Sequence, residues 1–176
     1  IVREPVGVCG LIVPWNFPFT MAIWKISMAA LMGNSVILKP ASDTPLSALA
    51  LARIIAQSKI PKGVVNILSG PGGALGQVLC THPKVDKIAF TGSTEVGRLI
   101  QRKLAGTAKH YTLELGGKAA NIIFDDAAID QAVEGIVNGI FFNQGHVCCA
   151  GSRLLVQENV HDEVVAKLKR RLQTLR

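Results

Sequence analysis

The strongest constraint on the fold is a regular alternation of short apolar runs with longer helix-forming segments. The runs are rich in β-branched residues and are apolar on both faces, which is typical of strands in a covered parallel sheet. Five runs fall in the first part of the chain, at residues 6–13, 35–38, 64–68, 87–90 and 111–115. Helices are expected between them at about 19–32, 44–58, 75–80 and 95–104. The pattern predicts an α/β fold with a mostly parallel sheet and helices on both faces.

The order of elements changes after Gly117. A strand is expected at 121–124, a helix at 128–142, a strand at 154–156 and a helix at 160–172. We therefore predict two domains, residues 1–115 and 116–176, the second being the start of another α/β layer. Because no closing element follows the last helix, we expect the chain to be a segment of a longer protein.

Charge and composition argue against several classes of function. The net charge is +7, and the densest basic cluster lies at 167–176, where cations complement the C-terminal end of a helix. With one Tyr and two Trp there is no stacking platform for bases, so we expect no nucleic-acid partner. No apolar run is long enough to span a membrane, and the start of the chain lacks the pattern of a secretory leader. The four scattered cysteines do not form a disulfide framework, so we expect a reducing, cytoplasmic location.

Ligands of such sheets bind beyond the carboxyl ends of the strands, and polar motifs follow several predicted strands there. The glycine-rich turn Gly70–Gly76 lies between a strand and a helix, but Leu75 breaks the G-x-G-x-x-G spacing, and a plain flexible turn is the alternative. Gly92–Gly97 is a second phosphate-binding candidate, with an ordinary helix cap at Ser93 or Thr94 as the alternative. Two candidates at one edge favour a dinucleotide.

Lys39 follows its strand directly, so its ammonium group is expected at the same edge, where it could hold ribose hydroxyls or a phosphate. The alternative is an ordinary surface lysine. Thr44 is expected to cap the next helix, with Pro45 at its first position.

Three residues have side chains suited to acyl chemistry. Glu114 stands in an apolar strand end, where a buried carboxylate would be a general-base candidate, although a glutamate exposed to solvent is equally compatible. Asn16 could direct its amide at a developing oxyanion, or be a turn residue. Cys148 and Cys149 lie in a turn after two Phe residues, where a nucleophile and a pair of small buried side chains are both possible.

A metal site built from His110, His146, Cys148 and Cys149 is not expected. Adjacent cysteines bind one ion poorly, and the chain has no C-x-x-C spacing.

Five motifs, taken together in order and spacing, closely resemble the NAD(P)-dependent aldehyde dehydrogenase superfamily over essentially the whole chain. They are Pro14-Trp15-Asn16-Phe17-Pro18, Lys39-Pro40-Ala41, Phe90-Thr91-Gly92-Ser93-Thr94-Glu95-Val96-Gly97, Leu113-Glu114-Leu115-Gly116-Gly117-Lys118, and Phe142-Asn143-Gln144-Gly145 followed by Cys148. The resemblance implies a Rossmann-like cofactor domain at 1–115, the start of a catalytic domain at 116–176, NAD or NADP as cofactor, an aldehyde substrate, and a full-length homo-oligomer.

The resemblance also implies residue roles. Cys148 would be the nucleophile, Asn16 and the Cys148 N–H would form the oxyanion hole, and Glu114 would activate the deacylating water. The cofactor groove would be lined by Val13, Trp15, Lys39, Ser42, Gly72, Gly76, Gly92, Ser93, Val96 and Leu115. A thiohemiacetal on Cys148 would give up a hydride and become a thioester, which water would release as a carboxylic acid.

The chain departs from the family pattern in three places. His146 stands two residues before the nucleophile, where Gln or Glu is usual, and a protonated imidazole there could stabilise a thiolate. Ser42 stands where many NAD-preferring members carry Glu, so NADP remains open. The family's downstream Glu-x-Phe motif, which contacts the nicotinamide ribose, is absent because the chain ends before its expected position.

Two rivals to an aldehyde-oxidising enzyme remain. The coenzyme-A-acylating relatives generally lack the base that Glu114 supplies here. A non-catalytic nucleotide-binding or scaffold segment of a larger protein is the rival from another class.

Overall fold

The computed structural model describes residues 2–175. The chain divides into two compact units, residues 1–115 and residues 116–176. The division lies between Leu115 and Gly116.

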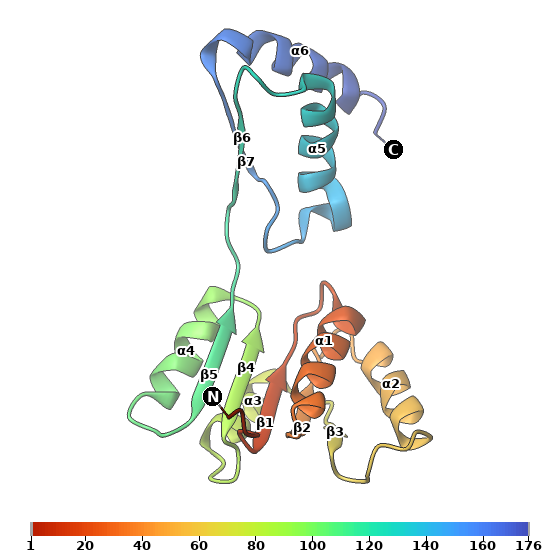
Figure 1. The fold of residues 1–176 in the computed structure, drawn as a ribbon, viewed down its shortest axis with the longest axis vertical. Coiled ribbons are helices and arrows are strands. Elements are labelled where there is room, and N and C mark those ends of the chain that lie inside the picture. The colour runs from red at the N-terminus through yellow and green to blue at the C-terminus, as the bar shows by residue number, and fades with distance from the viewer. Residues whose placement is uncertain (1, 176) are drawn as a thin grey trace. The chain divides into compact units, whose positions relative to one another are not determined.

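The first unit is built on a five-stranded parallel sheet with the strand order β3-β2-β1-β4-β5. The strands are β1 (Val8–Ile12), β2 (Ser35–Lys39), β3 (Val65–Ile67), β4 (Lys87–Thr91) and β5 (His110–Glu114). One helix connects each strand to the next along the chain from β1 to β5, and Figure 1 shows the strands with these helices. The predicted α/β fold with a mostly parallel sheet is confirmed.

Helices cover both faces of this sheet, because side chains of a strand point alternately to its two sides. The helices are α1 (Pro18–Leu31), α2 (Leu46–Ala56), α3 (Gly72–Thr81) and α4 (Thr94–Leu104). Cys9, Leu11 and Val13 pack with buried residues of α1 and α2 in one core. Ile12, on the opposite side of β1, packs with buried residues of α3 and α4 in a second core.

The central strands are buried almost completely, as their apolar sequence predicts. Val36, Leu38 and Ile88 have no exposed surface. Full burial of one such side chain contributes about 1.5–3 kcal/mol to folding. The strands therefore form a rigid base for whatever lies at their ends.

Helix starts agree with the sequence in one case and differ in another. Ser93 caps α4, since its Oγ accepts a hydrogen bond from the Val96 N–H at 3.3 Å. The prediction for Thr44 was wrong: α2 begins at Leu46, and Pro45 occupies the cap position with helical dihedral angles. The Thr44 hydroxyl is buried and has no hydrogen-bond partner among the described residues.

Asn34 ties the start of β1 to the end of α1. Its Oδ1 accepts hydrogen bonds from the N–H groups of Val6 and Gly7, at 2.7 and 3.0 Å. Its Nδ2 donates to the Ala29 carbonyl at 3.0 Å. Because Asn34 is buried, these bonds satisfy a polar side chain that would otherwise destabilise the unit.

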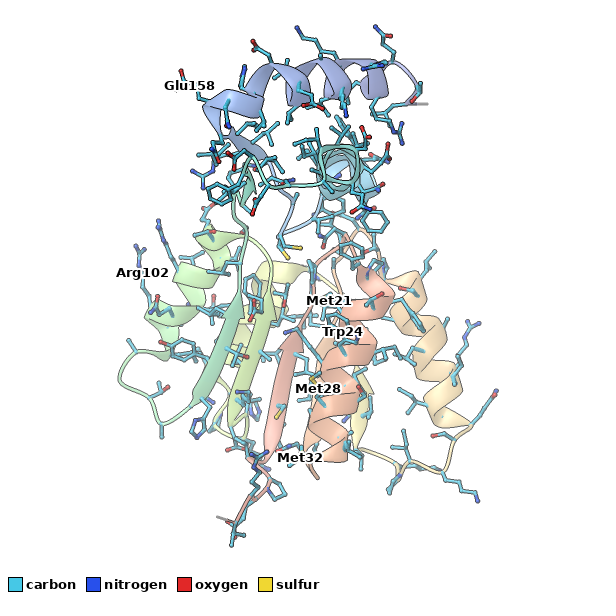
Figure 2. The ribbon with its side chains drawn as sticks, turned by 45° about the horizontal axis from the view of Figure 1, so that its top comes forward. Met21, Trp24, Met28, Met32, Arg102 and Glu158 are labelled. Carbon is cyan, nitrogen blue, oxygen red and sulfur yellow. The ribbon has the colours of Figure 1, made fainter. Side chains whose placement is uncertain are left out.

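The outer side of α1 is apolar. Trp24, Met28, Leu31 and Met32 are exposed, and Figure 2 labels Trp24, Met28 and Met32 along this helix. The sheet-facing side of the same helix carries the buried Ala22 and Ile26. An otherwise apolar helix thus contains one charged residue, Lys25.

The second unit contains a parallel pair of strands, β6 (Ala120–Ile123) and β7 (Arg153–Val156), with helices α5 (Ile129–Phe141) and α6 (His161–Leu172). Two short 3₁₀ helices, η1 (Phe142–Gly145) and η2 (Glu158–Val160), complete it. Its small core is formed by Ile123, Ile136 and Val164.

Ion pairs join α6 to α5 on the surface of this unit. The Lys167 ammonium lies 2.7 Å from the Asp130 carboxylate, and Arg171 lies 2.6 Å from Glu134. The basic cluster at the end of the chain is thus partly neutralised by carboxylates, although exposed pairs contribute little to stability. Across residues 2–175, no helix has the length and apolar character to cross a membrane.

Candidate functional site

The carboxyl ends of β1, β2, β4 and β5 meet at one edge of the first unit. The parallel register sets Ile12 beside both Lys39 and Phe90, and Thr91 beside Glu114. Val13 continues the alignment by donating its N–H to the Lys39 carbonyl at 3.1 Å. The motifs that follow these strands are therefore neighbours in space, as the sequence predicts.

Lys39 is buried at this edge, with 4% of its surface exposed. Its Nζ donates a hydrogen bond to Ser42 Oγ at 3.4 Å, and Ser42 Oγ donates to the Gly70 carbonyl at 3.0 Å. Burial lowers the pKa of Lys39, and the charge of Asp43 offsets part of this effect. The alternative of an ordinary surface lysine is thereby excluded.

The start of α3 lies directly over this lysine. A Cβ atom on Gly72 would stand 3.3 Å from Lys39 Nζ, whereas one on Gly73 would meet nothing within 4 Å. Helix α3 begins at Gly72, three residues earlier than predicted, so its first backbone N–H groups belong to the glycine-rich turn. Unpaired N–H groups at a helix start favour an anion, and here a cation stands beside them.

Gly76 belongs to the same helix and leaves room over the sheet. A Cβ atom at this position would be 4.0 Å from the end of the Ile12 side chain, which is ordinary van der Waals contact. Gly76 therefore packs against Ile12 of β1.

Gly92 and Ser93 form the turn between β4 and α4. The Gly92 N–H donates to the Glu114 carbonyl at 3.0 Å, which extends the β4–β5 pairing past the strand end. A Cβ atom on Gly92 would lie 2.5 Å from the Phe90 ring, so close packing requires glycine here. Val96 is exposed on the first turn of α4, and the Ser93 hydroxyl serves as the helix cap.

Glu114 ends β5 and is exposed within the first unit, so the buried-carboxylate interpretation does not hold there. It lies within electrostatic reach of Lys25 of α1. Burial lowers the pKa of Lys25, the charge of Glu114 raises it, and Lys87 lowers it further.

Sequence reasoning missed the electrostatic influence of Glu114 on Lys25. Lys25 is the only charged residue in the apolar sequence of α1, and that isolation was the available signal.

Trp15, Asn16 and Leu115 complete the predicted groove. Trp15 has 49% of its surface exposed and Asn16 is half-buried. Leu115 packs on α4, where a Cβ atom on Gly97 would come within 2.5 Å of its side chain. Close helix-to-strand packing thus fixes Leu115 at the end of the first unit.

Cys148 lies in a tight turn of the second unit. Asn143 and Gln144, with φ angles of 49° and 57°, have left-handed backbones, and Gly145 follows with 75°. The Ala150 N–H then donates to the Val147 carbonyl at 3.1 Å, so Cys148 and Cys149 occupy the centre of a hydrogen-bonded turn.

The two cysteines of this turn differ from the other two in the chain. Both are exposed in the second unit, whereas Cys9 and Cys80 are buried. The alternative that Cys148 and Cys149 are small core residues is therefore not what this unit shows.

The predicted residues thus belong to two units. The cofactor set, Asn16 and Glu114 lie in residues 1–115, and Cys148 lies in residues 116–176. The oxyanion hole, which would pair Asn16 with the Cys148 N–H, stays a prediction. Nowhere among residues 2–175 do three His, Cys, Asp or Glu side chains gather as metal ligands would.

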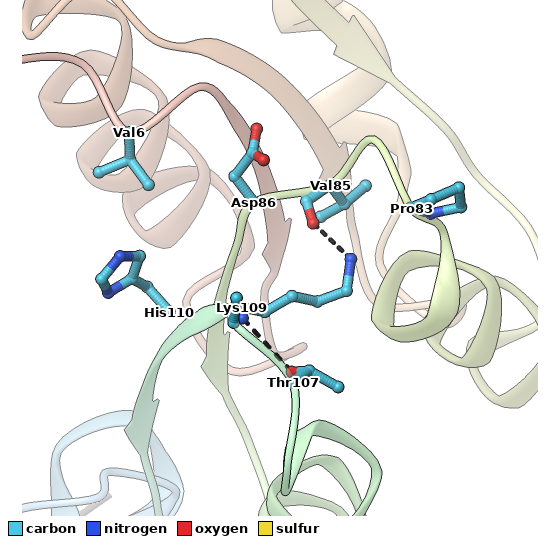
Figure 3. A pocket seen from close by; sticks show the side chains of 8 residues that line it. Val6, Pro83, Val85, Asp86, Thr107, Lys109 and His110 are labelled. Atoms are coloured by element: carbon cyan, nitrogen blue, oxygen red, sulfur yellow. Dashed lines mark hydrogen bonds between the residues drawn. The ribbon is translucent and has the colours of Figure 1, made fainter.

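A cavity of about 340 Å³ lies at the amino ends of the strands, at the edge opposite the candidate site (Figure 3). Its charged residues already have partners. Lys109 Nζ donates to the carbonyls of His82 and Val85, and the Asp86 carboxylate accepts from the Val8 N–H at 2.7 Å. These groups hold loops together, so we assign this cavity a structural role.

The chain is similar in sequence to a known family of proteins. The family model described as the aldehyde dehydrogenase family matches residues 1–176. An aldehyde dehydrogenase of Emericella nidulans is 54% identical over 172 residues, which are 97% of this chain and 35% of that protein.

Solved structures are similar as well. An NADP-dependent enzyme of E. coli superposes with a TM-score of 0.95 at 45% identity, covering 98% of this chain and 36% of that one. PnpE of Pseudomonas sp. WBC-3, also solved in complex with nicotinamide adenine dinucleotide, gives 0.94 at 44% identity, covering 99% of this chain and 36% of that one.

The chain spans about a third of the length of the relatives that it matches. The match nevertheless extends over residues 1–176, the range in which the five motifs lie. The chain belongs to the aldehyde dehydrogenase family.

Proposed function

We propose that this chain supplies the cofactor groove and the nucleophile of an NAD(P)-dependent aldehyde dehydrogenase that oxidises an aldehyde to a carboxylic acid. The observation that carries the proposal is the buried Lys39 beneath the start of α3, on the same sheet edge as Glu114. Ligand sites of α/β sheets lie at this edge.

The residues of the edge fit a dinucleotide. Because Gly72 has no side chain, there is space beside Lys39 Nζ. Ribose hydroxyls or a phosphate could be held there. The N–H groups at the starts of α3 and α4 favour the negative charge of a pyrophosphate. When bound, the cofactor supplies a nicotinamide ring that accepts hydride from the substrate.

The thiol of Cys148 supplies the nucleophile. As a thiolate, it adds to the aldehyde carbonyl and forms a thiohemiacetal, whose oxyanion Asn16 and the Cys148 N–H would stabilise. Loss of hydride from this carbon restores a carbonyl and leaves a thioester on Cys148. The exposed position of Cys148 in the second unit supports access by a small substrate.

Glu114 would release the acyl group. Its carboxylate removes a proton from water, which attacks the thioester carbon and frees the carboxylic acid and the Cys148 thiol. Glu114 is exposed in the first unit, where water can reach its carboxylate.

A second candidate is a segment that binds the cofactor without turnover. It is favoured by His146, at a position where the family usually has Gln or Glu. In this reading the groove remains and the chemistry is lost.

Incubation of the purified protein with an aldehyde and NAD or NADP discriminates the two candidates. We expect reduced nicotinamide to accumulate, and Cys148→Ala to lower the rate on the order of 10³-fold or more. Cys149→Ala is the matched control and should keep the rate within about threefold. Cofactor binding without turnover would favour the second candidate, and absence of binding would overturn both.

Replacement of Glu114 isolates the last step. Glu114→Gln should leave the first hydride burst and slow the steady rate by about 10²–10⁴-fold, the usual contribution of a general base. An unchanged steady rate would remove Glu114 from this role.

Ser42 is compatible with either cofactor in our proposal. Its hydroxyl is neutral and bonded to Lys39 and Gly70, so it does not repel a 2′-phosphate. Ser42→Glu should weaken NADP binding about tenfold or more and spare NAD, because it adds a negative charge beside Lys39. Equal losses for both cofactors would contradict this placement.

We also infer, from the family alone, a homo-oligomeric full-length protein in a reducing compartment such as the cytoplasm. Light scattering of the full-length protein measures the first part, and a monomer at micromolar concentration would contradict it.

A further inference from the structure

We propose that Cys149 is a resolving thiol for Cys148, so that a peroxide converts the adjacent pair into a reversible disulfide. The inference rests on the proposed function in one respect, namely that Cys148 is the reactive thiol of the pair. It adds a redox modification site to the nucleophile turn.

The geometry of the turn carries the proposal. The hydrogen bond from the Ala150 N–H to the Val147 carbonyl, at 3.1 Å, places Cys148 and Cys149 at its two central positions. Both residues are exposed in the second unit, as a reaction with a dissolved oxidant requires. Cys9 and Cys80 are buried in separate cores and cannot serve as partners for this pair.

The turn is held on its C-terminal side, which keeps any rearrangement local. Ala150 is buried, and the Gly151 N–H donates to the Gly139 carbonyl of α5 at 3.3 Å. On the other side, a Cβ atom on Gly117 would be 3.7 Å from the Cys148 carbonyl, so the glycine leaves ordinary space beside the turn.

Adjacency also explains why such a bond would be reversible. Neighbouring Cα atoms are about 3.8 Å apart across a trans peptide, whereas bridged cysteines are usually about 4.4–6.8 Å apart. The bond therefore closes with strain, and strained disulfides are reduced readily. A labile bond suits a protective or regulatory role better than a structural one.

The reaction balances with one peroxide. The Cys148 thiolate attacks a peroxide oxygen, breaks the O–O bond and becomes a sulfenic acid, while the leaving hydroxide takes up a proton as water. The Cys149 sulfur then attacks the Cys148 sulfur and displaces a second water. Two thiols have lost two electrons, and hydrogen peroxide has been reduced to two water molecules.

Without Cys149, a second peroxide would carry Cys148 to sulfinic acid, which ordinary thiols do not reduce. Cys149 thus protects the proposed nucleophile from irreversible loss.

Mass spectrometry of a single peptide tests the proposal. Cleavage after Lys118 and Arg153 yields residues 119–153, which contain Cys148 and Cys149 and neither Cys9 nor Cys80. After equimolar hydrogen peroxide, we expect this peptide to be two hydrogens lighter and to regain them with dithiothreitol. In Cys149→Ser, treatment with two or more equivalents of hydrogen peroxide should yield sulfinic acid at Cys148, at least tenfold more than the same dose yields in the unmodified sequence.

The peptides that contain Cys9 and Cys80 are internal controls and should stay reduced. Sulfinic acid formed equally with and without Cys149 would overturn the proposal, as would disulfides only between two copies on a non-reducing gel. Reduced nicotinamide is measured in parallel. A peptide disulfide in a protein without turnover refutes the proposed function alone, and turnover without the disulfide refutes this inference alone.

Discussion

The ammonium nitrogen of Lys39, at the end of β2, lies 3.3 Å from the point where a Cβ atom on Gly72 would stand at the start of α3. The two residues are far apart in sequence and come from different elements. The position of the lysine ammonium nevertheless restricts the side chain that residue 72 can carry. The lysine is nearly buried, and the glycine leaves the space through which its charge can act. This relationship leads us to favour a ligand groove over a plain flexible turn.

Substitution of Gly72 should weaken cofactor binding without loss of stability. The methyl group of Gly72→Ala would crowd Lys39 Nζ, and we expect the Kd for NAD or NADP to rise about tenfold, or 1.4 kcal/mol. Gly73→Ala is the matched control, because its methyl group meets nothing within 4 Å. Both changes remove a helical glycine and should stabilise the fold by up to about 1 kcal/mol. Equal binding by the two variants in calorimetry would contradict the groove.

Lys25→Met should stabilise the protein at neutral pH. Burial lowers the pKa of Lys25 from its usual 10.5, so the charged form is disfavoured in the folded protein. Between the lowered value and 10.5 the unfolded chain binds more protons, and the stability of the native sequence rises with pH. The destabilisation that comes from burying the charged lysine is greatest below that pH window and disappears above it.

We therefore expect Lys25→Met to raise Tm by about 2–4 °C at pH 7 and to lose this advantage as the pH approaches 10.5. The exposed Lys62→Met serves as control and should show neither effect. Calorimetric scans across pH measure both variants, and a stability gain that does not change with pH would refute the burial argument.

Gly97 and Leu115 should be energetically coupled. A methyl group on Gly97 would lie 2.5 Å from the Leu115 side chain, so Gly97→Ala should lose about 1 kcal/mol net despite the better helix propensity of alanine. In the Leu115→Ala background the obstructing side chain is gone, so adding Gly97→Ala should no longer cost about 1 kcal/mol. Gly135→Ala in α5, which meets nothing within 4 Å, should gain up to about 1 kcal/mol. Urea unfolding of the double-mutant cycle gives the coupling, and a value near zero would contradict the contact.

Gln144 should be a strained position. Its φ of 57° is left-handed, a conformation that costs about 1–2 kcal/mol for a residue with a side chain. Gln144→Gly should therefore stabilise the second unit by about 0.5–1 kcal/mol, and Gln144→Val should destabilise it by about 1 kcal/mol. Gln131→Gly, in the helical backbone of α5, should have the opposite sign from Gln144→Gly. The same sign for both glycines in urea titrations would refute the strain.

Much of the first unit follows from local pattern. Strands buried on both faces have apolar, β-branched sequences, and Ser93 before α4 is an ordinary helix cap, so both could be predicted. The Lys39 position was also predictable, because a residue that directly follows a parallel strand must lie at its carboxyl edge. The burial of its ammonium group was not, since that depends on α3 and the turn after β3.

The errors arise where distant segments decide the local structure. Thr44 has the sequence of a helix cap, yet the chain around Pro45 is already helical and the hydroxyl is left without a bond among the described residues. The left-handed backbone of Gln144 has no marker in its residue type, whereas Asn143 is of a type that adopts this conformation more readily. The interaction of Lys25 with Glu114 arises only when the fold brings β5 near α1.

The strand order β3-β2-β1-β4-β5 has a consequence for folding during synthesis on the ribosome. β1 can pair with β2 as soon as α1 has emerged, but its other neighbour, β4, is made only when synthesis reaches residues 87–91. Until then the central strand presents an open, apolar edge, and closing so long a loop is slow. Nascent chains stalled before β4 should therefore be the ones that associate wrongly or engage chaperones, whereas chains stalled after β5 should not.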